Sequence, residues 1–85
     1  MIREFRIGKT LYVADTEAHV EVGDKFIGPS VKNSYNIFKC VENDRLTEDE
    51  KEYYASENMI SATPLNESFY FGTERKHCYK IINEL

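Results

Sequence analysis

Short β-like runs separated by turn residues recur along most of the chain, and this spacing limits the possible folds more than any other feature. Glycine, proline, asparagine or aspartate follows nearly every run, and the runs return at intervals of about 8–12 residues. Only one stretch has helical signals. The pattern predicts an α+β fold: a small, strongly curved antiparallel sheet or an SH3- or OB-like β-barrel of about six or seven short strands, with one acidic helix near residues 47–58.

Two of the expected strands carry the most information about packing. In residues 18–22 apolar and polar side chains alternate cleanly, so Ala18, Val20 and Val22 are expected to face the core. Residues 34–42 are apolar on both faces, which is typical of a central strand, and we expect the helix to cover its second face. The strand-like runs are residues 2–7 and 10–14, joined as a hairpin, then 18–22, 25–27, 34–42, 59–63, 69–72 and 77–82, the last of which closes the sheet.

A capping box marks the start of the helix. Thr47 is followed three residues later by Glu50, and acidic residues fill the first turn, where the helix dipole favours negative charge. The helix is expected to begin at Thr47 or Glu48 and to end near Asn58. Its apolar stripe is narrow and consists of Leu46, one of Tyr53 and Tyr54, Ala55 and Met59.

The size and the N-terminal sequence set further expectations. A chain of 85 residues is expected to form one compact domain, residues 1–85, whose small core leaves room for stabilisation by a partner or by homodimerisation. The first residues are charged where a signal peptide needs an apolar stretch, and no apolar run is long enough to span a membrane. We therefore expect a cytoplasmic protein without membrane association.

The charge is unevenly distributed. Residues 41–58 hold seven acidic and two basic residues, while the net charge of the whole chain is −4. Both ends of the chain are basic. A segregated charge of this kind is either a solvated surface or a docking surface for a partner of opposite charge.

The acidic segment suggests a function in protein binding. We expect a non-enzymatic inhibitor, antitoxin-like or modulator protein, of the type of bacterial or bacteriophage accessory proteins. Its acidic helix would dock on a basic surface of a larger, nucleic-acid-handling protein. The residues expected to contact this partner are Glu48, Asp49, Glu50, Glu52, Tyr53 and Tyr54.

The basic ends suggest an alternative function. Basic and aromatic residues interleave on the terminal strands, which is what single-stranded RNA or DNA binding requires. The isoelectric point near 5.1 argues against it. The residues expected to bind nucleic acid in this alternative are Arg3, Arg6, Lys9, Arg75, Lys76 and Lys80.

No chemical motif in the sequence predicts catalysis. Asp15, Glu17, His19 and Glu21 would share one face of a strand, but neighbours on that face lie nearly 7 Å apart, so a metal or acid–base site would need ligands from another strand. Cys40 and Cys78 lack the spacing of a zinc or redox motif and are expected to be buried, reduced thiols, although adjacent strands could allow a disulfide. We therefore predict no catalytic residue, no metal site and no cofactor.

Overall fold

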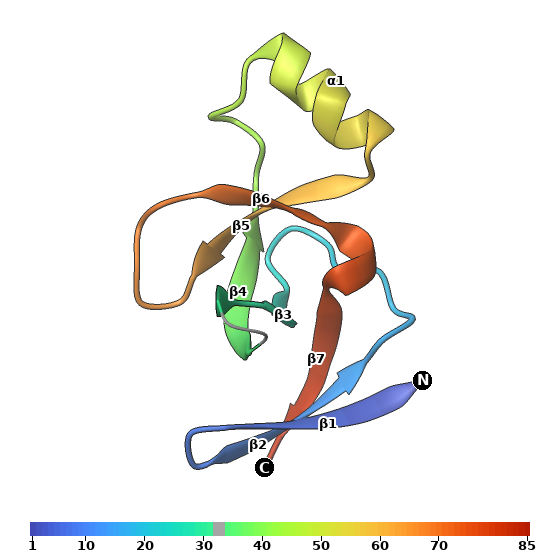
Figure 1. Cartoon of the computed structure of the whole chain (residues 1–85), viewed down its shortest axis with the longest axis vertical. Helices are drawn as coiled ribbons and strands as arrows, with labels where there is room; N and C mark the ends of the chain where they lie inside the picture. Colours follow the sequence, from blue (N-terminus) through green and yellow to red (C-terminus); the bar gives the residue numbers. More distant parts are fainter. Residues whose placement is uncertain (32–33) are drawn as a thin grey trace.

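The computed structural model describes residues 1–31 and 34–85, which form one antiparallel sheet and an α-helix (Figure 1). Gly8 adopts the left-handed backbone conformation, with φ of 62°, and makes the tight turn of the first hairpin as expected. The elements are β1 (Ile2–Ile7), β2 (Thr10–Asp15), β3 (Lys25–Pro29), β4 (Tyr35–Val41), α1 (Glu48–Ser56), β5 (Met59–Pro64), β6 (Phe71–Glu74), the 3-10 turn η2 (Arg75–His77) and β7 (Tyr79–Glu84).

The seven strands follow the order β1-β2-β7-β3-β4-β5-β6, and every neighbouring pair is antiparallel. The sheet curls into a half-barrel that leaves β1 and β6 as its two edges. This confirms the expected small, strongly curved antiparallel sheet with one helix. The C-terminal strand does not close the sheet at an edge, because β7 lies in the middle, paired with β2 on one side and β3 on the other.

Side chains are buried on both faces of the central strands. Phe26 and Ile27 are neighbours on β3, so they point to opposite faces, and both are fully buried. One face holds the cluster of Val20, Phe26, Phe38, Cys40, Ile60, Ala62 and Cys78, and the other holds Phe5, Ala14 and Ile27. The two ends of the sheet therefore curl over opposite faces of β3 and β4.

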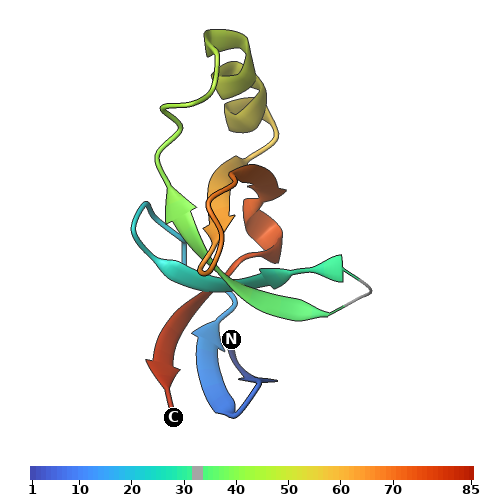
Figure 2. The ribbon, with the colours of Figure 1, turned by 90° about the vertical axis from the view of Figure 1, so that its left-hand side faces the viewer.

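The expected burial of β4 on both faces is confirmed, but the helix does not provide the cover. Phe38 and Cys40 pack against β5, while Ile37 packs on the other face with residues of the β1–β2 hairpin. The Phe5 ring of β1 lies 5.0 Å from the Tyr35 ring of β4. The curl of the sheet thus brings together two strands that are far apart in its order. Helix α1 packs against β5 at one end of the molecule, away from the β1–β2 hairpin (Figure 2).

The strand expected at residues 18–22 is wrong. Val20 is buried as the alternation predicts, but Val22 is 53% exposed and the segment pairs with no strand. The Val20 carbonyl accepts a hydrogen bond from Nη1 of Arg75 instead of a strand amide. Gly23, with φ of 96°, and Asp24 then turn the chain into β3. The alternation of apolar and polar residues therefore predicts the burial of Val20 correctly, but the segment lacks the backbone hydrogen bonds to a neighbouring strand that define a β-strand.

Several element boundaries also differ from expectation. Strand β3 continues through Gly28 and Pro29, past the expected end at residue 27. Helix α1 ends at Ser56, two residues before Asn58, which has a left-handed φ of 52°. Strand β6 begins at Phe71, so the expected strand at residues 69–72 starts too early. The last strand starts at Tyr79 because Arg75–His77 form the 3-10 turn η2, which places His77 outside the sheet. Among the described residues no helix has the length and apolar character needed to cross a membrane.

Candidate functional site

Helix α1 starts with the capping box that the sequence predicts. The Glu50 backbone N–H donates to Thr47 Oγ1 at 3.2 Å, and the Thr47 N–H donates to Glu50 Oε1 at 2.9 Å. These reciprocal bonds satisfy two amides that the first helical turn leaves free. Glu50 therefore has a structural role at the start of the helix, in addition to any role in binding.

The helix buries none of its residues. Its main attachment to the sheet is Tyr54, whose ring lies over Gly72 of β6 beside Met59. A methyl group added at Gly72 would clash with the Tyr54 ring, so the absent side chain makes room for the phenol. Of the two adjacent tyrosines, Tyr54 therefore packs inward and Tyr53 faces solvent, 58% exposed.

The loop before α1 is fixed to the sheet and holds the helix in place. Arg45 places its guanidinium 4.1 Å from the centre of the Tyr70 ring. The Ser61 hydroxyl donates a hydrogen bond to the side chain of Asn43. After the helix, Arg75 donates hydrogen bonds from Nε to the side chain and from its backbone N–H to the carbonyl of Asn58. Because contacts hold the chain on both sides of α1, the exposed helix keeps a defined position on the sheet.

The remaining acidic side chains of α1 point to solvent. Glu48, Asp49 and Glu52 are exposed, and the Glu48 side chain is 90% accessible. Lys51 forms an ion pair of 3.6 Å with Glu48. An exposed pair of this kind contributes little to stability. The exposed surface of α1 consists of Glu48, Asp49, Glu52 and Tyr53, and we call it the acidic helix surface.

The six basic residues of the alternative site do not gather on one surface. Arg3 and Arg6 are three positions apart on β1 and so point to opposite faces of the sheet. The Arg3 guanidinium lies over the Phe5 ring at 4.7 Å and near the Tyr35 ring at 5.4 Å. Lys9 lies in the turn at the end of the β1–β2 hairpin.

The other three members of that set are engaged within the chain. Arg75 binds the Val20 carbonyl and donates from Nε to the Asn58 side chain at 3.3 Å. Lys76 pairs with Glu74 at 3.2 Å, and Lys80 pairs with Asp24 at 3.5 Å. Each of these three basic side chains therefore already has a partner within the chain.

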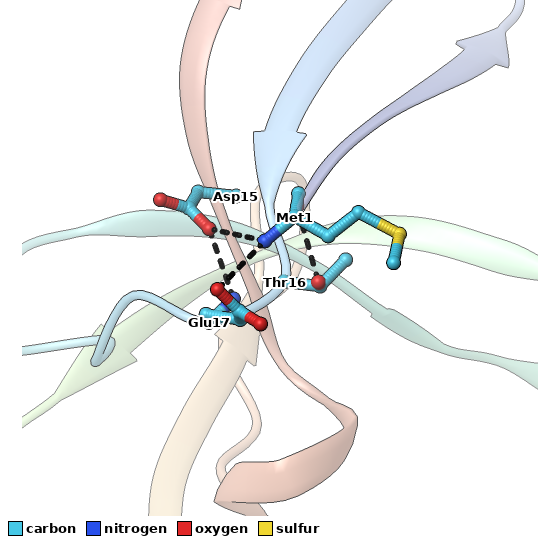
Figure 3. A network of polar contacts seen from close by, with 4 residues as sticks. All are labelled: Met1, Asp15, Thr16 and Glu17. Carbon is cyan, nitrogen blue, oxygen red and sulfur yellow. Dashed lines mark hydrogen bonds and ion pairs between the residues drawn. The ribbon is translucent and has the colours of Figure 1, made fainter.

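The acidic cluster near Asp15 forms no metal site. Its first two members bind the N-terminal amine: Met1 N lies 3.4 Å from Asp15 Oδ1 and 3.1 Å from Glu17 Oε2 (Figure 3). The Glu17 backbone N–H also donates to Asp15 Oδ1 at 2.9 Å, and this bond is the main reason why the pKa of Asp15 is lowered. His19 and Glu21 lie on the loop before β3. No three His, Cys, Asp or Glu side chains of the described residues are placed to hold a metal ion.

Both cysteines are buried as free thiols in the same core cluster. Burial raises the pKa of both thiols, for Cys78 from 9.0 to about 11. A thiol with a raised pKa holds its proton at neutral pH and is a poor nucleophile. Their arrangement fits a structural role and gives no support to a catalytic one.

An apolar groove lies between the β3–β4 hairpin and the loop before β6, and sequence reasoning missed it. The groove has a volume of about 460 Å³, and its walls include Val31, Phe38, Phe69 and Phe71. Phe69 is 53% exposed because β6 begins only at Phe71. The three consecutive aromatic residues 69–71 could have indicated this groove. Because we interpreted them as part of a strand, we did not expect the Phe69 ring to be exposed.

Comparison with known proteins gives no assignment. No protein-family profile, no curated protein and no solved structure matches this chain.

Proposed function

We propose that this chain is a non-enzymatic binding protein that docks its acidic helix surface on a positively charged surface of a larger protein. The observation that carries the proposal is that α1 is capped and held by contacts before and after it, and yet buries none of its residues. A helix that is polar on all sides adds little to a hydrophobic core, and such helices often serve as bridges to another domain or partner.

The charges on α1 exceed what helix stability requires. Glu48, Asp49 and Glu50 lie in the first turn, where the helix dipole favours them. Glu52 and Glu57 lie beyond that turn, and no basic residue occupies the last turn. Since this arrangement does not benefit the dipole, attraction to a basic partner is the stronger explanation for it.

Tyr53 supplies the apolar contact that a charged surface lacks. Its ring is exposed and lies edge-on to Tyr54, with 6.5 Å between the ring centroids. Tyrosine is a frequent energetic centre of protein interfaces because it buries a large rigid ring and keeps a polar tip. We expect Tyr53 to be the anchor and the surrounding carboxylates to steer the approach.

The partner that this surface suits best is a nucleic-acid-handling protein. Such proteins have basic surfaces that accept phosphates, and exposed carboxylates can occupy the same surface. The chain would then act as an inhibitor, antitoxin-like protein or modulator. The finer likeness to SH3-like or OB-like barrels stays a prediction, and a shared fold would not by itself imply a shared function.

The test is capture of a partner with matched variants. The test variant carries Glu48→Gln, Asp49→Asn, Glu52→Gln and Tyr53→Ala, and it keeps Glu50 for the capping box. The control variant carries Glu17→Gln, Glu21→Gln, Glu67→Gln and Phe69→Ala, which also removes three exposed carboxylates and one exposed aromatic ring. We expect wild type and control to retain a common basic protein from a lysate at low salt and the test variant to lose it. Equal retention by the two variants would overturn the proposal.

Nucleic-acid binding is measured in parallel by fluorescence anisotropy of a labelled single-stranded RNA. Lys9→Glu and Lys76→Glu are suitable changes, because neither side chain holds the fold in the way that Arg75 does. We expect no RNA binding by the wild type at low salt. Binding that weakens steeply with salt and is lost in these variants would replace protein docking by the alternative function.

A further inference from the structure

Strand β1 leaves an edge of the sheet open, and the hydrogen bonds of the hairpin identify the backbone groups on that edge. The Thr16 N–H donates to the Met1 carbonyl at 2.9 Å, which makes residues 1 and 16 a directly bonded pair. In an antiparallel ladder bonded pairs alternate, so Arg3, Phe5 and Ile7 bond to β2. The free N–H and C=O groups of the edge are therefore those of Ile2, Glu4 and Arg6.

The next strand pair supports the same alternation. Leu11 exchanges both backbone bonds with Leu85, at 2.8 and 3.3 Å, so its amide and carbonyl point away from β1. Leu11 lies opposite Arg6 in the register of the hairpin. The backbone of Arg6 must consequently point away from β2, toward solvent.

The side chains on this edge carry opposite charges. Glu4 and Arg6 point to the same face of β1, opposite to Phe5, and both are exposed. Within the described part of the chain neither forms an ion pair. A six-residue edge strand with free hydrogen-bonding groups is a template for pairing with another strand.

We propose that a second copy of this chain pairs with the β1 edge, antiparallel and with Phe5 opposite Phe5 of the partner subunit. The twofold axis then passes through this position, as a symmetric dimer interface requires. Glu4 lies opposite Arg6 of the partner subunit, and Arg6 lies opposite Glu4 of the partner subunit. The two residues of each such pair also exchange both backbone hydrogen bonds.

The charges of Glu4 and Arg6 and the pattern of free backbone groups favour this strand register over registers shifted by one or two residues. A shift by one residue would place free backbone groups opposite groups that already bond to β2, so it forms no ladder. A shift by two residues would place Glu4 opposite its own copy, or Arg6 opposite its own copy. Like charges directly opposite each other destabilise strand pairing, whereas opposite charges stabilise it.

The dimer is independent of the proposed docking function. Strand β1 and helix α1 lie at opposite ends of the molecule, so pairing through β1 leaves both helices of the dimer exposed (Figures 1 and 2). Failure of the β1 test leaves the docking of α1 untouched, and the reverse also holds.

The test is sedimentation equilibrium of the full chain with charge-exchange variants. We expect the wild type to be dimeric at high concentration, and Glu4→Arg alone or Arg6→Glu alone to weaken the dimer at least about 10-fold, because each places like charges opposite one another. The double variant Glu4→Arg/Arg6→Glu restores opposite charges and should restore the dimer. A mixture of the two single variants should form a heterodimer.

Circular dichroism is used to check that each variant keeps its sheet, and recovery of the dimer in the double variant and in the mixture would exclude loss of folding as the cause. A wild type that stays monomeric up to about 1 mM would overturn the proposal, because a dimer with a dissociation constant above that concentration is too weak to be a specific complex. A dimer that the single variants leave unchanged would place the interface elsewhere and would also overturn it.

Discussion

Strand β3 and helix α1 are the two extremes of burial in this chain. Phe26 and Ile27 of β3 are completely buried on opposite faces of the sheet, whereas none of the nine residues of α1 is buried. An isolated helix of this length is marginal in water, so α1 depends on its capping box and on the contact of Tyr54 with Gly72. The contrast places β3 in the core of the fold and leaves α1 exposed, as the proposed docking requires.

The largest expected effect on the free energy of unfolding comes from a substitution in the buried strand β3. Phe26→Ala removes a ring packed 5.7 Å from the Phe38 ring and leaves a cavity, so we expect a loss of about 3–5 kcal/mol in the free energy of unfolding. Urea denaturation measures this loss. A change below about 1 kcal/mol would contradict the central position of β3.

The reactivity of the buried Cys78 thiol provides a second test of the core that contains Phe26. The pKa of Cys78 is raised to about 11 by burial, so its thiolate at neutral pH is about 100-fold less populated than that of a thiol at 9.0. Because this pKa is raised on folding, the thiol's contribution to stability is complete below pH 9 and is lost as the pH rises toward 11.

We expect alkylation by iodoacetamide to be slow in the folded chain and to accelerate in urea. Thermal unfolding should shift to lower temperature above pH 9. Fast alkylation of Cys78 under native conditions would show that this part of the core opens readily.

A substitution at the contact between helix and sheet tests how α1 is held. An added methyl group in Gly72→Ala would lie 2.6 Å from Cζ of Tyr54 and 2.9 Å from Cε of Met59, so the ring must move away. We expect a loss of about 1–2 kcal/mol. Hydrogen exchange of residues 48–56 should accelerate while that of β3 stays constant. Equal acceleration in both regions would mean that α1 and the core unfold together.

The capping box predicts a more local effect. Thr47→Ala removes the acceptor for the Glu50 amide and should lower helix stability by about 1 kcal/mol. The helical signal in circular dichroism should decrease while the midpoint of thermal unfolding changes little. Thr47→Ser keeps the hydroxyl and is the matched control.

The smallest effect on stability is expected on the acidic helix surface. Glu48→Gln, Asp49→Asn and Glu52→Gln alter exposed side chains and keep the capping box. Made singly, each should change the free energy of unfolding by less than about 0.5 kcal/mol, with the loss at Glu48 and Asp49 arising from the helix dipole. Urea denaturation checks this value. A loss above about 1 kcal/mol would show that these carboxylates serve the fold rather than a partner.

Local signals in the sequence were sufficient for several elements. The capping box at Thr47 depends on residues three positions apart, and the first hairpin depends on Gly8; both were predicted correctly. The burial of β4 on both faces followed from its composition. The angle between adjacent helical residues left two outcomes open for Tyr53 and Tyr54, one ring exposed or both beside the core, and the structure shows the first.

The errors arose where the outcome depends on residues distant in sequence. Residues 18–22 alternate like a strand, but Arg75 binds the Val20 carbonyl and no strand lies alongside. The central position of β7 requires knowledge of the whole sheet order. For the candidate site, the acidic residues and the capping role of Glu50 were visible in the sequence, whereas the contact of Tyr54 with Gly72 appears only in the structure.

Hydrogen exchange of the free chain and of its complex with the captured partner tests the central claim most directly. If α1 is held for docking, residues 48–56 exchange rapidly in the free chain, β3 exchanges slowly, and partner binding slows exchange in α1 most strongly. Protection of α1 equal to that of β3 in the free chain, or slowing on binding that is confined to the sheet, would contradict the claim.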